Sequence, residues 1–542
     1  MNNLRVVMAQ QGFEIGDISG NVQKIIQLTM QAYQEQQADL VLFPELCLIG
    51  YPPEDLLLRP SLTLRINEAM DLLLQANLPC AIVIGVPIHV DGQLFNSAVC
   101  LSENKIIHKY HKQCLPNYQV FDEKRYFTMG DQSSVFEFKG VKLSLLVCED
   151  IWFDEPIKQA KEFGAQVLLT INASPFHLDR VSHRVKRVEK MAKKYELAVL
   201  YVNGHYGQDE LVFDGASFVV NQYGQLTHRS AQFADDMMLV DIKVETPLCS
   251  VIEGSKAESL TLMASLHQAL VLGLKSYVNK NGFPGVVLGL SGGIDSGLSL
   301  AIAVDALGAD RVHAVMMPFA YTSEISIADA KEQADLLGVK FDIVPIVDVF
   351  DASFKTLQPV LNLEEPGVTE QNLQARIRGV MLMAISNKTG SMVLTTGNKS
   401  EMAVGYATLY GDMCGGYNAL KDVPKTLVFE LSRYLNTLKP SIPPRVIERP
   451  PSAELAPDQK DEDSLPPYDI LDAIIECYVE EDLSADAIVA KGFEQETVYW
   501  VCKQIDRNEY KRQQAAEGVR ITPRGFGKDR RYPITHKWLA GI

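Results

Sequence analysis

Three residues that can activate one another lie at the ends of predicted strands in the first half of the chain. Glu45 follows the apolar run ADLVLFP, Cys148 ends the run VKLSLLV, and Lys112 follows an extended run that begins at Lys105. A cysteine attacks as its thiolate, so it requires a base or a cation nearby. Glu45 can take the thiol proton, and Lys112 can stabilise the oxyanion that forms at a carbonyl. Together they predict an amidase that proceeds through a thioester.

Each of these residues also has an ordinary structural interpretation. A cysteine at the end of an apolar strand is most often an inert core residue. A glutamate after a strand is most often a helix start or a surface charge, and spacing alone does not bring the three side chains together. The choice between the two interpretations therefore depends on the residues around them.

The surrounding motifs favour the catalytic interpretation. In chain order they are FPELCLIGYPPEDLL, HKxxLPNYxVFDEKRYF and LLVCEDIW, and they resemble the nitrilase superfamily, in particular its glutamine-hydrolysing domains. The resemblance implies that Glu45 is the general base, that Lys112 stabilises the tetrahedral intermediate and that Cys148 is the nucleophile.

The same resemblance implies a set of glutamine-binding residues. It places Tyr118, together with Ser174 and Arg180 from NASPFHLDR, around the glutamine, and Arg180 can pair bidentately with an α-carboxylate. Glu123 in FDEKRYF corresponds to the extra glutamate that some nitrilases use. Two other glutaminase designs are excluded, because no cysteine follows Met1 and no G-x-C-x-G nucleophile motif is present.

The second half of the chain contains a turn suited to phosphate. GVVLGL-SGGIDSG-LSLAIAVDALG reads as a strand, a glycine turn and a helix. Gly292 and Gly293 allow close approach of an anion, Ser291 and Ser296 add hydroxyl donors, and the helix N-terminus adds backbone amides. The loop lacks the G-K-[ST] ending of the Walker A motif, so it does not predict γ-phosphate transfer. A glycine pair alone would be explained by strand–helix packing.

This loop resembles that of the ATP pyrophosphatases, which cleave ATP between the α- and β-phosphates and adenylate an oxygen of the substrate. The resemblance implies ATP binding at Gly289, Leu290, Ser291, Gly292, Gly293, Ile294, Asp295 and Ser296. An acid such as Asp295 inside a phosphate loop requires a cation, for which Mg²⁺ is the expected ion.

Further candidates follow in LTTGNKSEMAVGYATLYGDMCGGYNALKDVPK. Thr396 ends a predicted strand and is expected to face the nucleotide. Glu401 is a second candidate Mg²⁺ ligand, Lys425 a candidate for the phosphates, and Asp412 lies in a glycine-rich turn.

Upstream, TEQNLQARIRG places Asn372, Arg376 and Arg378 on a predicted helix. Asn372 and Arg376 are four residues apart and share a face of this helix. Without the neighbouring motifs, Arg376 and Arg378 would be interpreted as a solvated face.

From near Ser259 to the C-terminus these segments resemble the NAD synthetases, and with the nitrilase-like half the chain resembles the glutamine-dependent members. The resemblance implies adenylation of the deamido-NAD⁺ carboxylate by ATP with Mg²⁺, attack by ammonia from glutamine, and release of AMP, diphosphate and glutamate. It places deamido-NAD⁺ at Asn372, Glu401 and Lys511, and it implies a homo-oligomer.

Gly297 stands where alanine is usual, which costs little in the first turn of a helix. Ammonia is protonated in water, so a water-poor tunnel to the second site is expected.

The elements that must position these residues alternate along the chain. Short runs rich in Val, Leu and Ile alternate with amphipathic stretches, which is typical of an α/β protein. A polar segment near residues 244–258 marks a domain boundary. With this boundary, the resemblances above imply a nitrilase-like αββα sandwich at residues 1–245, a linker at 246–260, and a Rossmann-like parallel-sheet domain of the ATP-pyrophosphatase type at 261–542.

Composition narrows the function classes. The 542 residues include 51 Lys and Arg against 68 Asp and Glu, a net charge of −17 that disfavours nucleic acid as the main partner. The nine cysteines do not form a disulfide framework, no apolar run reaches the length of a membrane span, and no signal peptide is evident. We expect a cytoplasmic enzyme. Two alternatives remain: an AMP-forming amide ligase for another carboxylate, and a catalytically inactive binding protein on the same folds.

Overall fold

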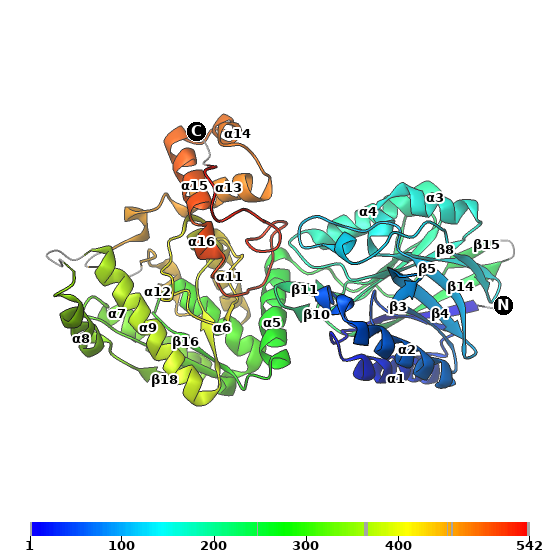
Figure 1. Cartoon of the computed structure of the whole chain (residues 1–542), viewed down its shortest axis with the longest axis horizontal. Coiled ribbons are helices and arrows are strands. Elements are labelled where there is room, and N and C mark those ends of the chain that lie inside the picture. The colour runs from blue at the N-terminus through cyan, green and yellow to red at the C-terminus, as the bar shows by residue number, and fades with distance from the viewer. Residues whose placement is uncertain (1–2, 246–247, 362–366, 453, 457–458, 539–542) are drawn as a thin grey trace. The chain divides into compact units, whose positions relative to one another are not determined.

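The computed structural model describes residues 3–245, 248–361, 367–452, 454–456 and 459–538. The chain divides into two compact units (Figure 1). The first comprises Met1–Tyr206 and Val212–Thr261, and the second comprises Gly207–Leu211 and Leu262–Ile542.

Two β-sheets form the centre of the first unit. One sheet has the order β15 (Leu248–Val251), β14 (Asp236–Glu245), β1 (Asn3–Gln10), β2 (Leu40–Leu42), β3 (Ala81–Val90), β4 (Gln93–Ser102) and β5 (Lys105–His111). The other has the order β13 (Leu226–Arg229), β12 (Phe218–Val220), β9 (Ala198–Asn203), β8 (Val167–Asn172), β7 (Val141–Val147) and β6 (Val135–Phe138). The hairpin of β10 (His205–Gln208) and β11 (Leu211–Asp214) forms a separate small sheet.

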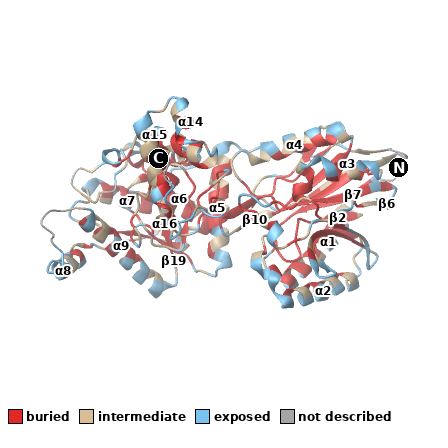
Figure 2. Ribbon diagram, turned by 45° about the horizontal axis from the view of Figure 1, so that its top comes forward, coloured by how far each residue is buried: buried red, intermediate tan, exposed pale blue. Residues whose placement is uncertain are grey.

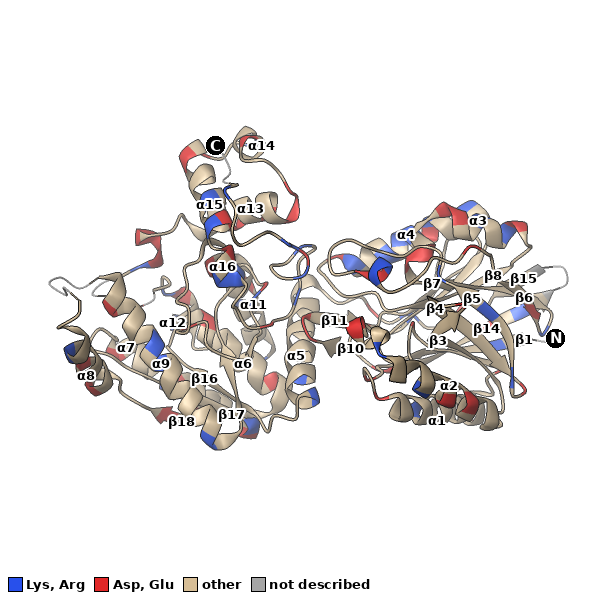
Figure 3. Cartoon of the chain, in the orientation of Figure 1, with Lys and Arg blue, Asp and Glu red and all other residues tan. Residues whose placement is uncertain are grey.

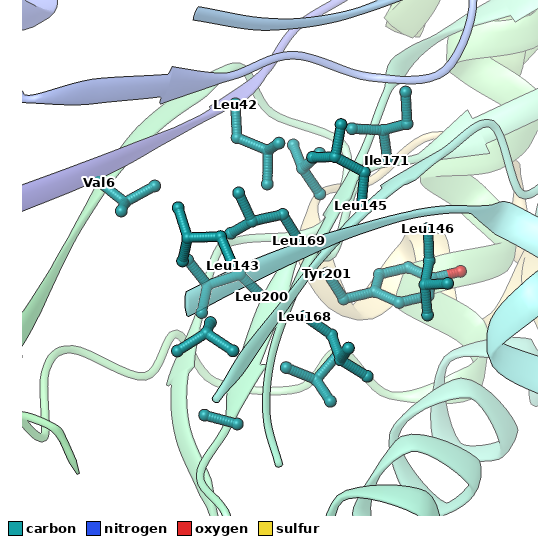
Figure 4. Close-up of a cluster of buried hydrophobic side chains, with 14 of the residues drawn as sticks. Val6, Leu42, Leu143, Leu145, Leu146, Leu168, Leu169, Ile171, Leu200 and Tyr201 are labelled. Carbon is teal, nitrogen blue, oxygen red and sulfur yellow. The ribbon is translucent and has the colours of Figure 1, made fainter. Parts of the chain in front are cut away.

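The main core of the first unit lies between its two sheets. Figure 4 shows Val6 and Leu42 near Leu143, Leu145 and Leu169, which all belong to one cluster of buried side chains. The central strands β7, β8 and β9 pair in parallel, and their residues are almost continuously apolar because both faces of the sheet are covered. This packing places the ends of β2, β5 and β7 against one another.

Helices cover the outer faces of both sheets, as Figure 1 shows. They are α1 (Ile18–Gln36), α2 (Pro60–Gln75), α3 (Asp154–Glu162) and α4 (Arg180–Tyr195). α1 and α2 contact β1 and β3, whereas α4 contacts β9 and β12. The expected αββα sandwich is therefore confirmed. Both signs of charge lie side by side on the solvent faces of α3 and α4 (Figure 3).

One segment differs from its expected role as a linker. Leu248–Val251 form β15, an edge strand that pairs with β14, and residues 246–247 lie outside the described part of the chain. The polar composition of this segment marked a boundary, but an edge strand needs only one buried face, so its pattern is too weak to read from sequence.

The second unit is built on one parallel sheet with the order β18 (Lys340–Ile343), β17 (Val312–Met316), β16 (Val286–Gly289), β19 (Met392–Thr395) and β20 (Tyr417–Asn418). Its longer helices are α5 (Leu262–Lys280), α6 (Ile294–Leu307), α7 (Glu324–Leu337), α8 (Val347–Leu357), α9 (Val368–Thr389), α11 (Lys425–Leu438), α13 (Tyr468–Ile475) and α15 (Gln495–Arg507). Shorter helices are α10 (Lys399–Val404), α12 (Pro444–Glu448), α14 (Ala485–Ala490) and α16 (Glu509–Arg512). The expected parallel-sheet domain is confirmed. Figure 2 shows that the central strands of both units are buried.

The loop between β16 and α6 requires glycine at one position. Gly292 has a φ of +80°, and a Cβ there would lie 2.3 Å from the carbonyl oxygen of Ser326. No other residue type fits this combination of a left-handed backbone and close approach. The turn therefore delivers the N-terminus of α6 to the carboxyl end of the sheet.

The C-terminal stretch at residues 520–537 carries six basic residues against one acid, Asp529, and two of its arginines are internal. Arg520 pairs with Asp529, and Arg530 pairs with Glu509 at 2.9 Å. Both arginines are buried. A run of basic residues is ordinarily solvated, but these two are not, because Asp529 within the stretch and Glu509 outside it pair with them.

Two further expectations can be checked directly. All nine cysteines lie in the described part of the chain and are free thiols. Within those same ranges, no helix is long and apolar enough to cross a membrane.

Replacing Leu145 by alanine is expected to lower the free energy of unfolding of the first unit by about 2–5 kcal/mol, because buried methyl groups are lost and a cavity remains. Leu145 is fully buried in the core between the sheets. Chemical denaturation measures the change. The control is Leu64→Ala on α2, whose side chain is 65% exposed and whose loss should cost less than about 0.5 kcal/mol. Equal destabilisation by both variants would contradict this description of the core.

Candidate active sites

Cys148 occupies a strained turn at the carboxyl end of β7. It begins the 3₁₀ turn Cys148–Trp152 with a φ of +46°, a left-handed conformation that costs a residue with a Cβ about 1–2 kcal/mol. The turn is held by Asp150, whose Oδ2 accepts a hydrogen bond from the backbone N–H of Val147 at 3.0 Å. This geometry directs the thiol out of the strand ladder.

Asp150 also holds the segment that carries Lys112. Its Oδ1 accepts from the backbone N–H groups of Gln113 and Cys114 at 3.1 and 2.8 Å, and its Oδ2 accepts from Tyr110 Oη at 2.8 Å. One buried carboxylate is therefore shared by the turn of the nucleophile and the chain next to the lysine. Burial raises the pKa of Asp150 to about 6. Sequence reasoning noted Asp150 only as a neighbour of the cysteine, because its distant donors depend on how β5 meets β7.

Lys112 is buried between two carboxylates. Its Nζ lies 2.8 Å from Glu45 Oε1 and 2.8 Å from Glu123 Oε1. Burial opposes the charge of the ammonium, but Glu123 and Glu45 outweigh it and raise the pKa of Lys112 well above its usual value. Lys112 is therefore a fixed positive charge.

Glu45 is held by two further donors that sequence reasoning missed. Asn96 Nδ2 donates to its Oε1 at 2.8 Å, and the backbone N–H of Ala173 donates to its Oε2 at 3.0 Å. Asn96 lies on β4, and no local motif distinguishes it from other polar strand residues. These bonds fix both oxygens of the proposed base.

The electrostatics of the thiol and of Glu123 follow from burial and from these neighbours. Burial and the charge of Glu45 raise the pKa of Cys148 well above that of a free thiol, while Lys112 lowers it. Burial raises the pKa of Glu123 to about 7, against the opposing effect of Lys112. The thiol therefore stays protonated until a base removes its proton.

The three predicted glutamine-binding residues belong to the surroundings of this centre. Tyr118 Oη donates to Glu149 Oε1 at 2.7 Å, and the Arg180 guanidinium lies over the Trp152 ring at 4.6 Å. Ser174 is buried directly after Ala173. Glu149, the buried acid that follows the nucleophile in LLVCEDIW, was not assigned a role from the sequence.

In the second unit, a cavity of about 640 Å³ lies beside the carboxyl ends of the parallel strands. The predicted residues that line it are Gly289, Leu290, Ser291, Gly293, Ile294, Asp295, Ser296, Asn372, Arg378, Thr396, Glu401, Asp412, Lys425 and Lys511. Gly292 and Arg376, although described, do not line it. Arg376 is exposed and donates to the carbonyl of Leu409 at 3.2 Å.

The hydroxyl groups of the phosphate loop are engaged with the loop itself. Ser296 Oγ donates to the carbonyl of Gly293 at 3.0 Å and accepts from the backbone N–H of Ser291 at 3.2 Å. Ser291 Oγ accepts from the N–H of Gly293 at 3.3 Å. The serines therefore shape the turn, instead of presenting free donors as the sequence suggested.

A second buried lysine holds two carboxylates at the cavity. Lys425 Nζ contacts Asp295 Oδ2 and lies 3.3 Å from Glu401 Oε1. Burial raises the pKa of Glu401 to about 8, with Asp295 adding to it and Lys425 opposing it. Asn398, which caps α10, donates to Asp295 Oδ1 at 2.8 Å. Sequence reasoning passed over Asn398 within GNKSE.

These carboxylates provide hard oxygen ligands. Within the described residues, no group of three or more His, Cys, Asp or Glu side chains is placed to hold a metal ion. Asp295 and Glu401 nevertheless fit Mg²⁺, which typically takes one or two protein carboxylates and completes its shell with phosphate and water oxygens.

Asn372 and Lys511 lie on the cavity wall with partners of their own. Asn372 Oδ1 accepts from Thr408 Oγ1 at 2.7 Å. Lys511 Nζ donates to the carbonyls of Gly405 and Ala407 at 2.7 and 2.8 Å. Both residues brace the loop after α10 from which Asp412 also reaches the cavity.

Known families match successive parts of the chain. Residues 4–246 match the family described as carbon-nitrogen hydrolase, and residues 266–515 match the family described as NAD synthase. Both resemblances inferred from the motifs are confirmed.

Similar proteins extend over the whole chain. The glutamine-dependent NAD(+) synthetase of Acinetobacter baylyi is 48% identical over 542 residues, which cover 99% of each chain. That of Xylella fastidiosa (strain 9a5c) is 45% identical over 539 residues, again 99% of each. A solved structure of glutamine-dependent NAD+ synthetase from Acinetobacter baumannii in complex with ADP is 47% identical, with a TM-score of 0.80 and full coverage of both chains.

Lys112→Met and Glu45→Gln are expected to shift the reactivity of Cys148 in opposite directions. Lys112 lowers the pKa of the thiol and Glu45 raises it, so the lysine variant should need a higher pH for alkylation and the glutamate variant a lower one. The rate of Cys148 alkylation by iodoacetamide, measured against pH, gives the two midpoints. Cys148→Ala corrects for the other thiols. Shifts of the same sign in both variants would contradict this electrostatic arrangement.

Proposed function

The chain belongs to the glutamine-dependent NAD⁺ synthetase family, and on that premise we propose that it amidates deamido-NAD⁺ to NAD⁺ using ATP and glutamine. One observation carries the proposal: a single chain contains two buried lysine–carboxylate centres. One lies around the nucleophile Cys148, and the other lies beside a phosphate loop at a cavity. Residues 1–245 are proposed as the glutaminase domain and residues 261–542 as the synthetase domain.

In the proposed glutaminase reaction, Glu45 takes the proton of the Cys148 thiol and the thiolate attacks the amide carbon of glutamine. The ammonium of Lys112 stabilises the oxyanion. Ammonia leaves with the proton from Glu45, and a thioester remains. Glu45 then removes a proton from water, which hydrolyses the thioester to glutamate and restores the thiol.

Two opposite charges are suited to the zwitterionic end of glutamine. Arg180 is proposed to pair with the α-carboxylate, and Glu149 with the α-ammonium. Tyr118 donates to Glu149 and so holds that acid in place. Ser174 is proposed to hydrogen-bond the substrate as well.

In the proposed synthetase reaction, the nicotinate carboxylate of deamido-NAD⁺ attacks the α-phosphate of ATP. Diphosphate leaves and a mixed anhydride with AMP forms. Ammonia attacks the carbonyl carbon, and AMP leaves as the amide of NAD⁺ forms. The loop amides at Gly293–Ser296 and the cation of Lys425 face the phosphates. Mg²⁺, when held by Asp295 and Glu401, would neutralise phosphate charge.

The residues proposed to contact deamido-NAD⁺ and ATP are residues that line the cavity of the second unit. Asn372, Glu401 and Lys511 are proposed for deamido-NAD⁺, and Thr396 for ATP. All four residues line the same cavity, which is consistent with a reaction between the two ligands.

We also propose that ammonia passes between the sites through a water-poor channel, since ammonium is not nucleophilic. Incorporation of nitrogen from added ammonium as readily as from glutamine at equal concentration would contradict a channel.

A homo-oligomer is proposed from the family resemblance, and light scattering tests it. A cytoplasmic location is supported by the free thiols, and cell fractionation tests it.

The purified chain is expected to form NAD⁺ and AMP from deamido-NAD⁺ and ATP with Mg²⁺, with either glutamine or ammonium as nitrogen source. Cys148→Ala should lower the glutamine-driven rate by at least about 10³-fold, because the nucleophile is lost, and leave the ammonia-driven rate unchanged. Chromatography of NAD⁺, AMP and ADP measures both.

The control is Cys47→Ala, which removes another buried cysteine of the first unit and should retain glutamine-driven synthesis. Glutamine hydrolysis without NAD⁺ formation from ammonium would mean that the acceptor is a different carboxylate. ADP in place of AMP would exclude adenylation.

A further inference from the structure

A buried arginine organises the segment that carries Ser174. Arg184 lies on α4 and is 1% exposed. Its Nε donates to Ser174 Oγ at 3.1 Å, and its Nη2 donates to the carbonyls of Ser174 and Pro175 at 2.8 and 3.1 Å. Its Nη1 pairs with Asp214 Oδ1 at 2.7 Å. The rigid fork of the guanidinium thus reaches the serine through its side chain and its backbone at once.

Stability alone gives little reason for this arrangement. Desolvating a charged pair is costly, and replacing a buried ion pair by apolar side chains of similar volume is often neutral or stabilising. Asp214 Oδ2 has no hydrogen-bond partner within the described residues, so the pair is incompletely satisfied. A function in positioning explains why a charged fork occupies this place.

The contacts with Ser174 restrict its hydroxyl. The backbone N–H of Ser174 donates to Asn203 Oδ1 at 2.9 Å, and its carbonyl accepts from Asn203 Nδ2 at 3.2 Å. Arg184 has no acceptor atoms, so Ser174 Oγ must accept from Nε. Nε therefore occupies one acceptor site of Ser174 Oγ, and the hydroxyl proton points away from Arg184; the side chain of Tyr201 also interacts with Ser174.

We propose that Arg184 is a positioning residue for glutamine, which fixes the Ser174 hydroxyl as a hydrogen-bond donor to the substrate. It acts through Ser174 and does not touch glutamine. The proposal rests on the proposed function, in which Ser174 contacts glutamine, and it extends that function by naming the group that sets the direction of the contact.

The test compares two variants of the same buried pair. Arg184→Lys keeps a cation beside Asp214 but removes the fork that holds Ser174. Asp214→Asn, the matched control, removes the ion pair and leaves the bonds to Ser174 in place. The KM for glutamine and kcat are measured from glutamate release, with ammonia-driven NAD⁺ synthesis as the internal control.

Arg184→Lys is expected to raise the KM for glutamine about tenfold, as for the loss of one oriented hydrogen bond. In the same variant, kcat for glutamate release and the rate of ammonia-driven synthesis should each change less than about threefold. Asp214→Asn should lower the thermal midpoint but leave the KM within about threefold of the unmodified chain. A KM raised equally by both variants would overturn the proposal, because only a structural role predicts that result.

A double-mutant cycle shows whether Arg184 acts through Ser174. Ser174→Ala should raise the KM, and adding Arg184→Lys to it should raise the KM no further. Independent effects would overturn the inference. If Ser174→Ala leaves the KM unchanged, the proposed role of Ser174 fails instead, so the two failures are distinguishable.

A second route applies if Arg184→Lys does not fold. Arg184→Met combined with Asp214→Leu replaces the pair by apolar side chains, which a buried pair often tolerates. The KM should again rise about tenfold. A folded double variant with an unchanged KM would overturn the proposal.

Discussion

The first unit depends on a lysine that is buried away from water and held between two carboxylates. An isolated buried ammonium would lose its proton, so Lys112 stays charged only because Glu45 and Glu123 each lie 2.8 Å away. The sandwich is the device that assembles this centre. β2 and β5 of one sheet deliver Glu45 and Lys112, and β7 of the other delivers Cys148. Packing the two sheets face to face brings the three strand ends together, and Asp150 ties two of them to one carboxylate.

The second unit solves a related electrostatic problem for a different reaction. Lys425 again contacts two carboxylates, Asp295 and Glu401, but these lie on the wall of a cavity. The first centre is buried, and in the proposed reaction it acts on a neutral amide, so a fixed cation and an acceptor of one proton are sufficient. In the proposed reaction the second centre faces phosphates, so its carboxylates require a cation to be compatible with the ligand. In each centre a buried lysine supplies the positive charge: Lys112 in the first and Lys425 in the second.

The sequence was sufficient to single out the candidate residues at strand ends, because apolar runs locate the strands and the motifs around them resemble known families. Glu45, Lys112 and Cys148 were found in this way, as was the loop after β16. Asn96, Asp150 and Arg184 were not assigned roles, although they hold the predicted residues in place. Asn96 lies 51 residues from Glu45, the partners of Asp150 beyond its own turn lie 36 to 40 residues away, and those of Arg184 lie 9 to 30 residues away, so their roles depend on strand register and sheet packing. The ion pair of the buried Arg530 with Glu509, 21 residues away, could not be read from the sequence either.

The most direct test of this account is the pH dependence of glutamine hydrolysis in the unmodified chain and in Glu123→Gln. Burial raises the pKa of Glu123 to about 7, and protonation below that pH leaves Lys112 with Glu45 alone. The account predicts that kcat/KM falls below about pH 7 in the unmodified chain, and that Glu123→Gln lacks this midpoint and is slower at pH 8. Superimposable pH profiles with equal rates at pH 8 would contradict the claim that both carboxylates hold the lysine for catalysis.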